Sequence, residues 1–259
     1  MFSPGFHYIR GMKDMIIRSL RAAADMLMPR ICMTCGKKLL LEEKHICLQC
    51  MADLPRTFFW MQPRNPMADR LNERIEDAGL SAYEPYSYAA ALFFYRSDSI
   101  YRHIPQQIKY DRNLSAGAYF GRMLGRVLSG SEIFKDVDAV IPVPLHWKRK
   151  WKRGYNQAET IASAVAQTLD APLRTDIIRR GRHTKTQTKL GVGEKSANVA
   201  GAFETCGGFS DKECIRHILL VDDVFTTGST VGACFAALRQ VFPPEVRISV
   251  ATLAFAGGD

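Results

Sequence analysis

Two adjacent carboxylates and a run of hydroxyl groups stand close together in the stretch LLVDDVFTTGST, residues 219–230. Neighbouring aspartates can accept hydrogen bonds from vicinal hydroxyls, as on a ribose, and can help to hold a hydrated Mg²⁺. Hydroxyl and backbone N–H groups around a glycine, at the start of a helix, form a cradle for an anion. The stretch therefore predicts a ligand that carries both a sugar and a phosphate.

Each half of this site is assigned to its own residues. Asp222 and Asp223 take the sugar hydroxyls. The phosphate is assigned to Thr226, Thr227, Gly228, Ser229 and Thr230. Helix capping by Asp223 or Thr226 is the alternative, but a cap accounts for only one of these residues. A ligand-binding loop is therefore favoured.

A basic segment, residues 147–153, is a second cluster whose residue types could bind a ligand. Its cations are Lys148, Arg149, Lys150, Lys152 and Arg153, and Trp147 and Trp151 flank them at i, i+4 spacing. Cations at the same end of a sheet as the acid pair could bind pyrophosphate. Indole rings among cations could also stack the bases of single-stranded nucleic acid. The two interpretations are compatible, and a solvated surface loop is the plain alternative.

A second basic stretch, residues 179–195, contains six cations and a single acid, Glu194. Its cations are Arg179, Arg180, Arg182, Lys185, Lys189 and Lys195, and three glycines interrupt it. This composition predicts a loop that closes over pyrophosphate and excludes water. A basic loop without fixed structure is the alternative.

Four cysteines are paired as CMTC and CLQC, with eleven residues between the pairs. Cys32, Cys35, Cys47 and Cys50 are therefore predicted to hold a tetrahedral Zn²⁺. Four thiolates leave no open coordination position, so the metal is expected to be structural. His45, two residues before Cys47, is the alternative ligand.

Strands and helices alternate in the second part of the chain. Strands are predicted in YAAALFFYRS, VDAVIPVP, IRHILLVDDV and VRISVATLAFA, and helices in SAGAYFGRMLGRVLS, NQAETIASAVAQTL and STVGACFAALRQVF. This alternation predicts an α/β fold, a parallel sheet with helices on both faces. In such sheets ligands bind beyond the carboxyl ends of the strands, where both the acid pair and the basic segment fall.

The predicted organisation has four parts. An amphipathic helix over residues 1–28, which packs on the neighbouring domain or lies on a membrane surface, precedes the four-cysteine segment over residues 29–56. A polar linker over residues 57–87, with one helical turn around residues 71–78, leads to the α/β domain over residues 88–259.

Composition narrows the classes of protein. The chain has 259 residues, 47% of them hydrophobic, a net charge of +9 and a pI near 9.3. The clustered positive charge predicts an anionic partner. No apolar run reaches the ~18 residues of a membrane span, and charges interrupt the amino-terminal segment where a signal peptide is continuously apolar. A cytoplasmic protein is expected.

The stretch LLVDDVFTTGST resembles the phosphoribosyl-pyrophosphate signature of type I phosphoribosyltransferases. The resemblance implies that Asp222 and Asp223 are the catalytic, ribose-binding pair, that Mg²⁺ accompanies the ligand, and that residues 226–230 hold the 5′-phosphate. Members acting on 6-oxopurines carry an aspartate where this chain has Thr226, so that reaction is not expected.

From about residue 26 to residue 256 the chain resembles the ComF family. RGYNQ resembles the segment that closes the pyrophosphate loop, and QIKYDRN, with Lys109 and Tyr110, resembles the family's LKY segment. The downstream match comprises Arg180, Thr184, Gln187, Leu190, Lys195, Asn198 and Phe203. The family usually has arginine where this chain has Lys195. Lysine keeps the positive charge but lacks the planar guanidinium group that can bind two phosphate oxygens at once.

The resemblance implies two functions. The first is DNA uptake in natural competence, through binding of phosphoribosyl pyrophosphate or a related sugar phosphate, of single-stranded DNA and of proteins of the uptake machinery. The second is Mg²⁺-dependent phosphoribosyl transfer in nucleotide metabolism, for which no acceptor is recognisable. A ligand-sensing regulator is a third reading, although no helix-turn-helix is visible.

Overall fold

The computed structural model describes residue 15 and residues 24–80, 84–110, 112–145, 151, 153–181, 202–206 and 215–257. The chain forms two compact units, Met1–Leu54 and Pro55–Asp259. Within the first, residues 24–27 are helical, while most of the predicted amphipathic helix lies outside the described residues. Helix α2 (Leu48–Ala52) carries the last of the four paired cysteines. Among the described residues, no helix is long and apolar enough to cross a membrane.

The second unit is built on a parallel sheet. Its strands are β1 (Ala89–Phe94), β2 (Ala139–Pro142), β5 (His217–Phe225) and β6 (Arg247–Phe255), in the order β1-β6-β5-β2. Leu220 lies opposite Val250 of β6 and Ile141 of β2, which fixes the register at the centre. The central strands β5 and β6 are mostly buried, and most of their buried residues are apolar, as expected where helices cover both faces of a sheet.

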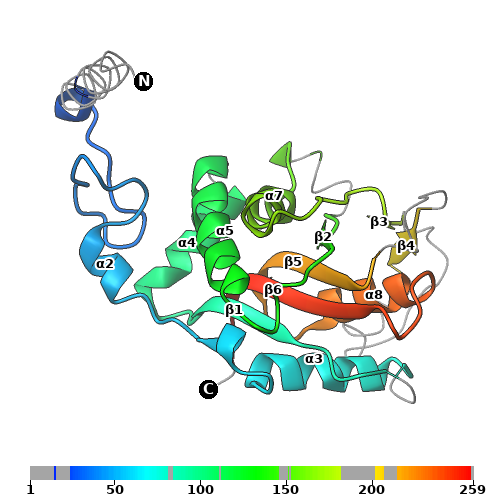
Figure 1. The fold of residues 1–259 in the computed structure, drawn as a ribbon. Coiled ribbons are helices and arrows are strands. Elements are labelled where there is room, and N and C mark those ends of the chain that lie inside the picture. Colours follow the sequence, from blue (N-terminus) through cyan, green and yellow to red (C-terminus); the bar gives the residue numbers. More distant parts are fainter. Residues whose placement is uncertain are drawn as a thin grey trace, which may run out of the picture. The chain divides into compact units, whose positions relative to one another are not determined.

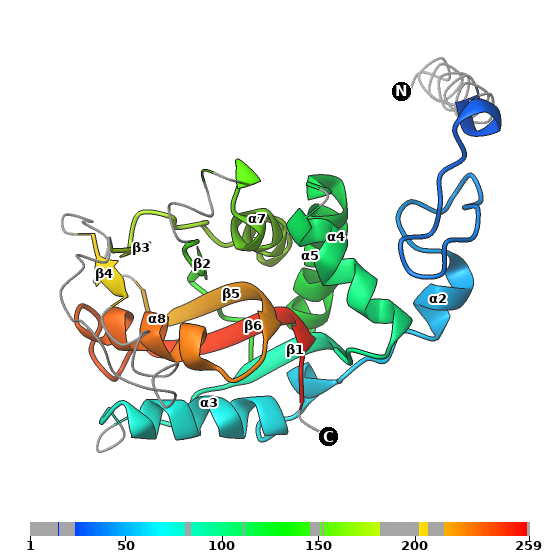
Figure 2. The same cartoon turned by 180° about the vertical axis from the view of Figure 1, so that it is seen from behind.

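Helices cover the two faces of this sheet (Figures 1 and 2). One face carries α4 (His103–Tyr110), α5 (Leu114–Ser129) and α7 (Gln157–Leu169), and the other carries α3 (Pro66–Asp77) and α8 (Ser229–Arg239). The predicted fold class, a parallel sheet with helices on both faces plus a small four-cysteine segment, is therefore confirmed.

Helix α3 occupies the stretch for which a polar linker with one helical turn was predicted, so that prediction was wrong. Asn65 caps the helix by accepting hydrogen bonds from the N–H groups of Met67 (3.1 Å) and Ala68 (3.0 Å), and Pro66 fits the first turn. Met67, Leu71 and Ile75 form a buried stripe at i, i+4 spacing. The apolar i, i+4 spacing is present in the sequence, but the polar residues and prolines around it are typical of a linker.

Shorter elements complete the second unit. They are the 3₁₀ helices η1 (Phe59–Met61) and η3 (Ile100–Arg102), and the strands β3 (Ile178–Arg180) and β4 (Phe203–Thr205). Strands β3 and β4 pair antiparallel, with Arg180 opposite Phe203. The segment between them, residues 182–201, contains most of the predicted closing loop and lies outside the described residues.

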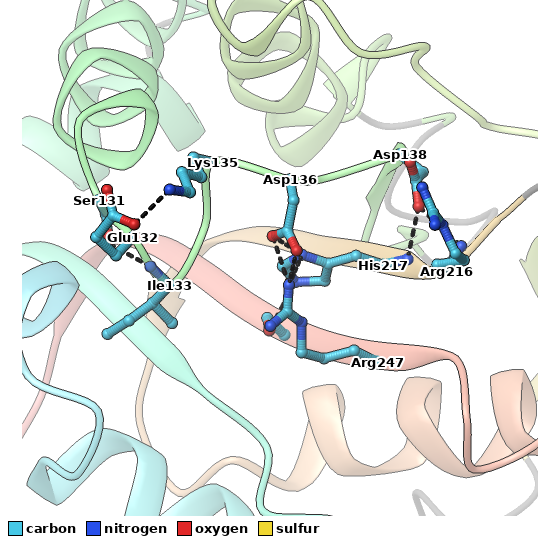
Figure 3. A network of polar contacts seen from close by, with 10 residues as sticks. Ser131, Glu132, Ile133, Lys135, Asp136, Asp138, Arg216, His217 and Arg247 are labelled. Carbon is cyan, nitrogen blue, oxygen red and sulfur yellow. Dashed lines mark hydrogen bonds and ion pairs between the residues drawn. The ribbon is translucent and has the colours of Figure 1, made fainter.

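A polar network ties the loop before β2 to the amino ends of β5 and β6 (Figure 3). The ring of His217, only 1% exposed, lies between the carboxylate of Asp136 (Nδ1 to Oδ1, 3.0 Å) and the hydroxyl of Ser249 (Nε2 to Oγ, 2.9 Å). Arg247 pairs with Asp136 and approaches Nδ1 of His217 to 2.9 Å. Asp138 accepts hydrogen bonds from the N–H groups of Arg216 and His217. The network therefore joins three segments far apart in sequence.

The network makes stability depend on pH. Burial, and next the charge of Arg247, lower the pKa of His217 to about 4 from its ordinary 6.5, despite the nearby acids Asp136 and Asp138. Below pH 6.5 the unfolded chain takes up a proton that the folded chain refuses, so the free energy of unfolding should fall as pH drops from 6.5 to 4. A loss of up to about 3 kcal/mol is expected from this residue.

Urea unfolding of wild type and His217→Gln at several pH values checks this expectation. The variant lacks the titrating ring, so its stability should change less between pH 6.5 and 4. Parallel pH curves for the two proteins would contradict the assignment.

Candidate functional site

A pocket of about 420 Å³ lies at the carboxyl ends of β2 and β5. Asp222, Asp223, Thr226 and Thr230 contribute to its lining. So do three basic residues from other parts of the chain, Lys109, Arg153 and Arg180. The fold thus brings the acid pair, part of the hydroxyl-rich segment and separate cations around one cavity, at the edge of the sheet where the sequence placed them.

The acid pair lies within strand β5, inside the predicted strand IRHILLVDDV and not beyond its carboxyl end. Strand β2 stops at Pro142, opposite Val221, whereas β5 continues beside β6 as far as Phe225. Asp222 and Asp223 therefore stand where β5 has lost its neighbour on the β2 side. Successive side chains of a strand point to opposite faces. Both can nevertheless line one pocket, because the cavity occupies the space beyond the end of β2.

Burial and hydrogen bonding set the electrostatics of the acid pair. Asp223 is 3% exposed, and its Oδ2 lies 3.0 Å from Nζ of Lys109 at the end of α4. Each carboxylate also accepts a hydrogen bond from the next residue's N–H, 2.8 Å for Asp222 and 2.9 Å for Asp223. Burial, and next the negative charge of Asp223, raise the pKa of Asp222 well above its usual value. The pocket floor therefore favours a ligand that brings a cation or hydroxyl donors.

Residues 226–230, called the phosphate loop below, join β5 to α8. Gly228 has φ +78° and is the amino cap of α8, with no side-chain hydrogen bond to the helix. A Cβ there would lie 2.8 Å from the ring of Phe225, so the turn requires glycine. The hydroxyls of Thr227 and Ser229 lie 2.9 Å apart. Neither Asp223 nor Thr226 caps the helix, so the capping alternative does not account for them.

Two arginines that the sequence did not single out contact this loop from α3. Arg70 Nη1 donates to the carbonyl oxygens of Thr226 and Ala256, each at 3.2 Å. Arg74 Nε donates to the carbonyl oxygen of Thr227 at 3.0 Å. Their i, i+4 spacing places them on one face of a helix, but it is informative only if the segment is first predicted to be helical.

The RGYNQ segment is held against the end of β2. Asn156 caps α7 through the N–H of Ala158 (3.2 Å) and donates to the carbonyl oxygen of Val143 (3.1 Å). Arg153 then enters the pocket lining, donates to Gln157 Oε1 at 3.1 Å, and lies 5.3 Å from the ring centre of Tyr110. This ring contact orients the guanidinium at the pocket wall.

The other residues predicted to bind pyrophosphate or nucleic acid divide into those that the structure describes and those that it does not. Arg180 lines the pocket and packs 5.2 Å over the ring of Phe203. Trp151 is 87% exposed. Lys148, Arg149, Lys150, Gln187 and Lys195 lie outside the described residues, so their assignments to pyrophosphate or nucleic acid remain predictions.

The four paired cysteines converge in the first unit. The Sγ atoms of Cys32, Cys35, Cys47 and Cys50 all lie within 4.8 Å of one another. Cys35 and Cys47 are 3.8 Å apart, which matches the separation of about 3.8 Å expected between two ligands of a tetrahedral ion with Zn–S bonds of about 2.3 Å. His45 is not part of this cluster within the described residues. The donor set therefore fits a structural Zn²⁺, as predicted.

Backbone amides prepare one thiol of the cluster for ionisation. Burial opposes it, but N–H groups of Cys35, Cys47 and Thr34 outweigh that effect and lower the pKa of Cys32 to about 6. Burial and neighbouring sulfurs raise the pKa of Cys50. Four thiols this close cannot all ionise without a cation, so the arrangement favours a bound metal ion.

No protein-family model matches the chain. It is 37% identical over 111 residues to Competence protein F of Haemophilus influenzae, covering 43% of this chain and 48% of that protein. It is 30% identical over 131 residues to the DNA utilization protein YhgH of Escherichia coli K12, covering 48% and 55%. Competence protein ComFC of Bacillus subtilis is 29% identical over 102 residues, covering 39% and 38%.

Among solved structures, orotate phosphoribosyltransferase from Aeropyrum pernix matches with a TM-score of 0.31 and 17% identity, covering 58% of this chain and 61% of that one. The chain spans about half the length, or less, of the curated relatives that it matches. Within that extent, these relatives confirm the predicted resemblance of the chain to the ComF family.

Proposed function

We propose that the chain binds phosphoribosyl pyrophosphate, or a related sugar phosphate, together with Mg²⁺, and that it acts in DNA uptake. The observation that carries this proposal is the meeting of Asp222, Asp223 and both ends of the phosphate loop, Thr226 and Thr230, in one pocket lined by cations. The acid pair would accept hydrogen bonds from the ribose hydroxyls and help to hold Mg²⁺. The phosphate loop would receive the 5′-phosphate at the amino end of α8.

The cations of the pocket suit the pyrophosphate group. Arg153 and Arg180 belong to different segments, yet both contribute to the lining. A guanidinium can bind two phosphate oxygens at once, which favours a pyrophosphate held between them. Lys109 neutralises Asp223 in the free protein, and Mg²⁺ would take over that role when the ligand binds.

Single-stranded DNA is the second proposed partner, and proteins of the uptake machinery are a third. The names of the relatives refer to competence and DNA utilization, and the net charge of +9 favours a polyanion. The basic segment, with Trp147 and Trp151 among its cations, offers both charge and stacking surfaces. A cytoplasmic location is part of the same proposal.

Two binding experiments test this function. Titration calorimetry with phosphoribosyl pyrophosphate should give Mg²⁺-dependent binding, and its absence would refute the sugar-phosphate assignment. The affinity for single-stranded DNA should fall with salt along a log–log slope of about −0.7 for each phosphate contacted. A slope near zero, or an unchanged slope after replacement of Lys148, Arg149 and Lys150 by glutamine, would exclude the basic segment as the DNA site.

Phosphoribosyl transfer is the second candidate function. Tyr95 and Gln106 also line the pocket, and their hydroxyl and amide groups could hydrogen-bond to an acceptor. In that reaction a nucleophilic nitrogen forms a bond to ribose C1 while the bond from C1 to pyrophosphate breaks. Pyrophosphate release that depends on an added nitrogen base would favour transfer over binding alone.

A further inference from the structure

The phosphate loop is held from behind by two arginines on α3. Arg70 donates to the carbonyl oxygen of Thr226 and Arg74 to that of Thr227. The two residues are one helical turn apart, so they reach consecutive peptide groups from one face of the helix. A Cβ at Gly232 would approach Cβ of Arg74 to 3.3 Å, which shows how closely α3 and α8 pack at this point.

These contacts fix the direction of two backbone N–H groups. In a trans peptide, the carbonyl and the following N–H point in opposite directions. With the carbonyls of Thr226 and Thr227 turned toward α3, the N–H groups of Thr227 and Gly228 point away from it. Within the part of the chain that the structure describes, neither N–H donates a hydrogen bond.

We propose that Arg70 and Arg74 are positioning residues that aim the N–H groups of Thr227 and Gly228 at a terminal phosphate ester. This inference rests on the proposed sugar-phosphate function, and it assigns selectivity for the 5′-phosphate to a helix outside the signature itself. The guanidinium groups also polarise the two peptide groups, which strengthens them as donors. Their role is indirect, because α3 binds the loop and the loop binds the ligand.

The test compares the full chain in four forms. They are wild type, the double variant Arg70→Met/Arg74→Met, the double variant Arg70→Lys/Arg74→Lys, and the control Arg64→Met. Arg64 stands just before α3 and packs 4.8 Å over the ring of Tyr86. The control therefore removes a nearby positive charge without removing a contact to the loop. Inorganic phosphate is titrated while the amide resonances of Thr227 and Gly228 are followed by NMR.

Both amides should shift in wild type and in Arg64→Met, and the half-saturating phosphate concentration should rise about tenfold or more in the double methionine variant. The lysine variant should fall between them, because lysine keeps the charge but not the planar donor geometry. Equal titrations for wild type and the double methionine variant, or wild-type amides that do not shift, would overturn the proposal. If the double variant does not fold, each single methionine variant is judged by the same criterion.

A parallel titration with phosphoribosyl pyrophosphate and Mg²⁺ separates this inference from the proposed function. If wild type does not bind that ligand while its two amides respond to phosphate in an arginine-dependent way, the proposed function fails and the positioning role stands. If wild type and the double methionine variant bind it equally well, the positioning role fails and the proposed function stands.

Discussion

Replacement of Asp223 by asparagine should weaken the binding of phosphoribosyl pyrophosphate with Mg²⁺ by about 100-fold or more. The carboxylate is almost fully buried at the pocket floor, where Lys109 offsets its charge. Asparagine is uncharged and accepts at one oxygen only, so it holds Mg²⁺ less strongly than a carboxylate and cannot accept charge-strengthened hydrogen bonds from ribose. Each such bond contributes about 1.5–3 kcal/mol. Titration calorimetry at fixed Mg²⁺ measures the loss.

Asp98→Asn is the matched control for this experiment. Asp98 is also an aspartate paired with one cation, Arg96, but the pair is exposed and contributes nothing to the pocket lining. Its affinity should equal that of wild type. If Asp223→Asn binds within about threefold of the control, the carboxylate does not contact the ligand as proposed.

The raised pKa of Asp222 gives the same site a dependence on pH. Burial and the neighbouring Asp223 keep a proton on Asp222 to higher pH than usual. Binding of Mg²⁺ and ribose requires the ionised carboxylate, so the proton must leave when the ligand binds. Affinity should therefore rise with pH and level off above the pKa of Asp222. In Asp222→Asn this rise should disappear, and calorimetry in buffers of different ionisation enthalpy should show proton release only for wild type.

Removal of the metal should unfold the four-cysteine segment while the parallel sheet stays folded. Purified protein should contain about one zinc per chain, and Cys50→Ser should contain none. Structural zinc contributes about 10–16 kcal/mol in small metal-dependent segments. Besides the four thiols, residues 25–50 contribute a small core that includes Leu39 and Ile46, and an ion pair of Arg30 with Asp25. Amide hydrogen exchange by residue distinguishes loss of this segment from global unfolding.

Cys206→Ser serves as the control for the metal site. Cys206 is partly exposed and stands outside the four-cysteine cluster, so its replacement should leave the zinc content unchanged. Zinc retained at full occupancy in Cys50→Ser, or absent from wild type, would contradict the assignment. Protection in the strands β5 and β6 should be the same in both variants, because these strands belong to a separate compact unit.

Local patterns were sufficient to predict much of the molecule. The apolar runs of β1, β2, β5 and β6 and the periodicity of α5, α7 and α8 are set by short-range constraints on burial, so these elements could be recognised without long-range information. The spacing of Cys32, Cys35, Cys47 and Cys50 limits how the chain can present four sulfurs, and the structure brings them together. The order of polar residues around Gly228 similarly indicated a loop at a helix start.

Helix α3 was not predicted from local patterns. Its buried stripe contains only three large side chains, Met67, Leu71 and Ile75, within a polar segment. The stripe stabilises a helix only because it packs against the sheet. Because the segment was predicted to be a linker, no role was predicted for Arg70 and Arg74. Their relation to the phosphate loop spans more than 150 positions of the chain, and no local pattern encodes it.

The sequence by itself determined which groups are available for chemistry: an acid pair, a hydroxyl-rich glycine turn and four thiols. Only the tertiary structure decided their electrostatic setting. It ends β2 four residues before β5, so that both acids line the pocket, and it places Lys109 of α4 against Asp223. Strand lengths and ion pairs of this kind follow from how distant elements pack, since burial and charge depend on neighbours in space and not on neighbours along the chain.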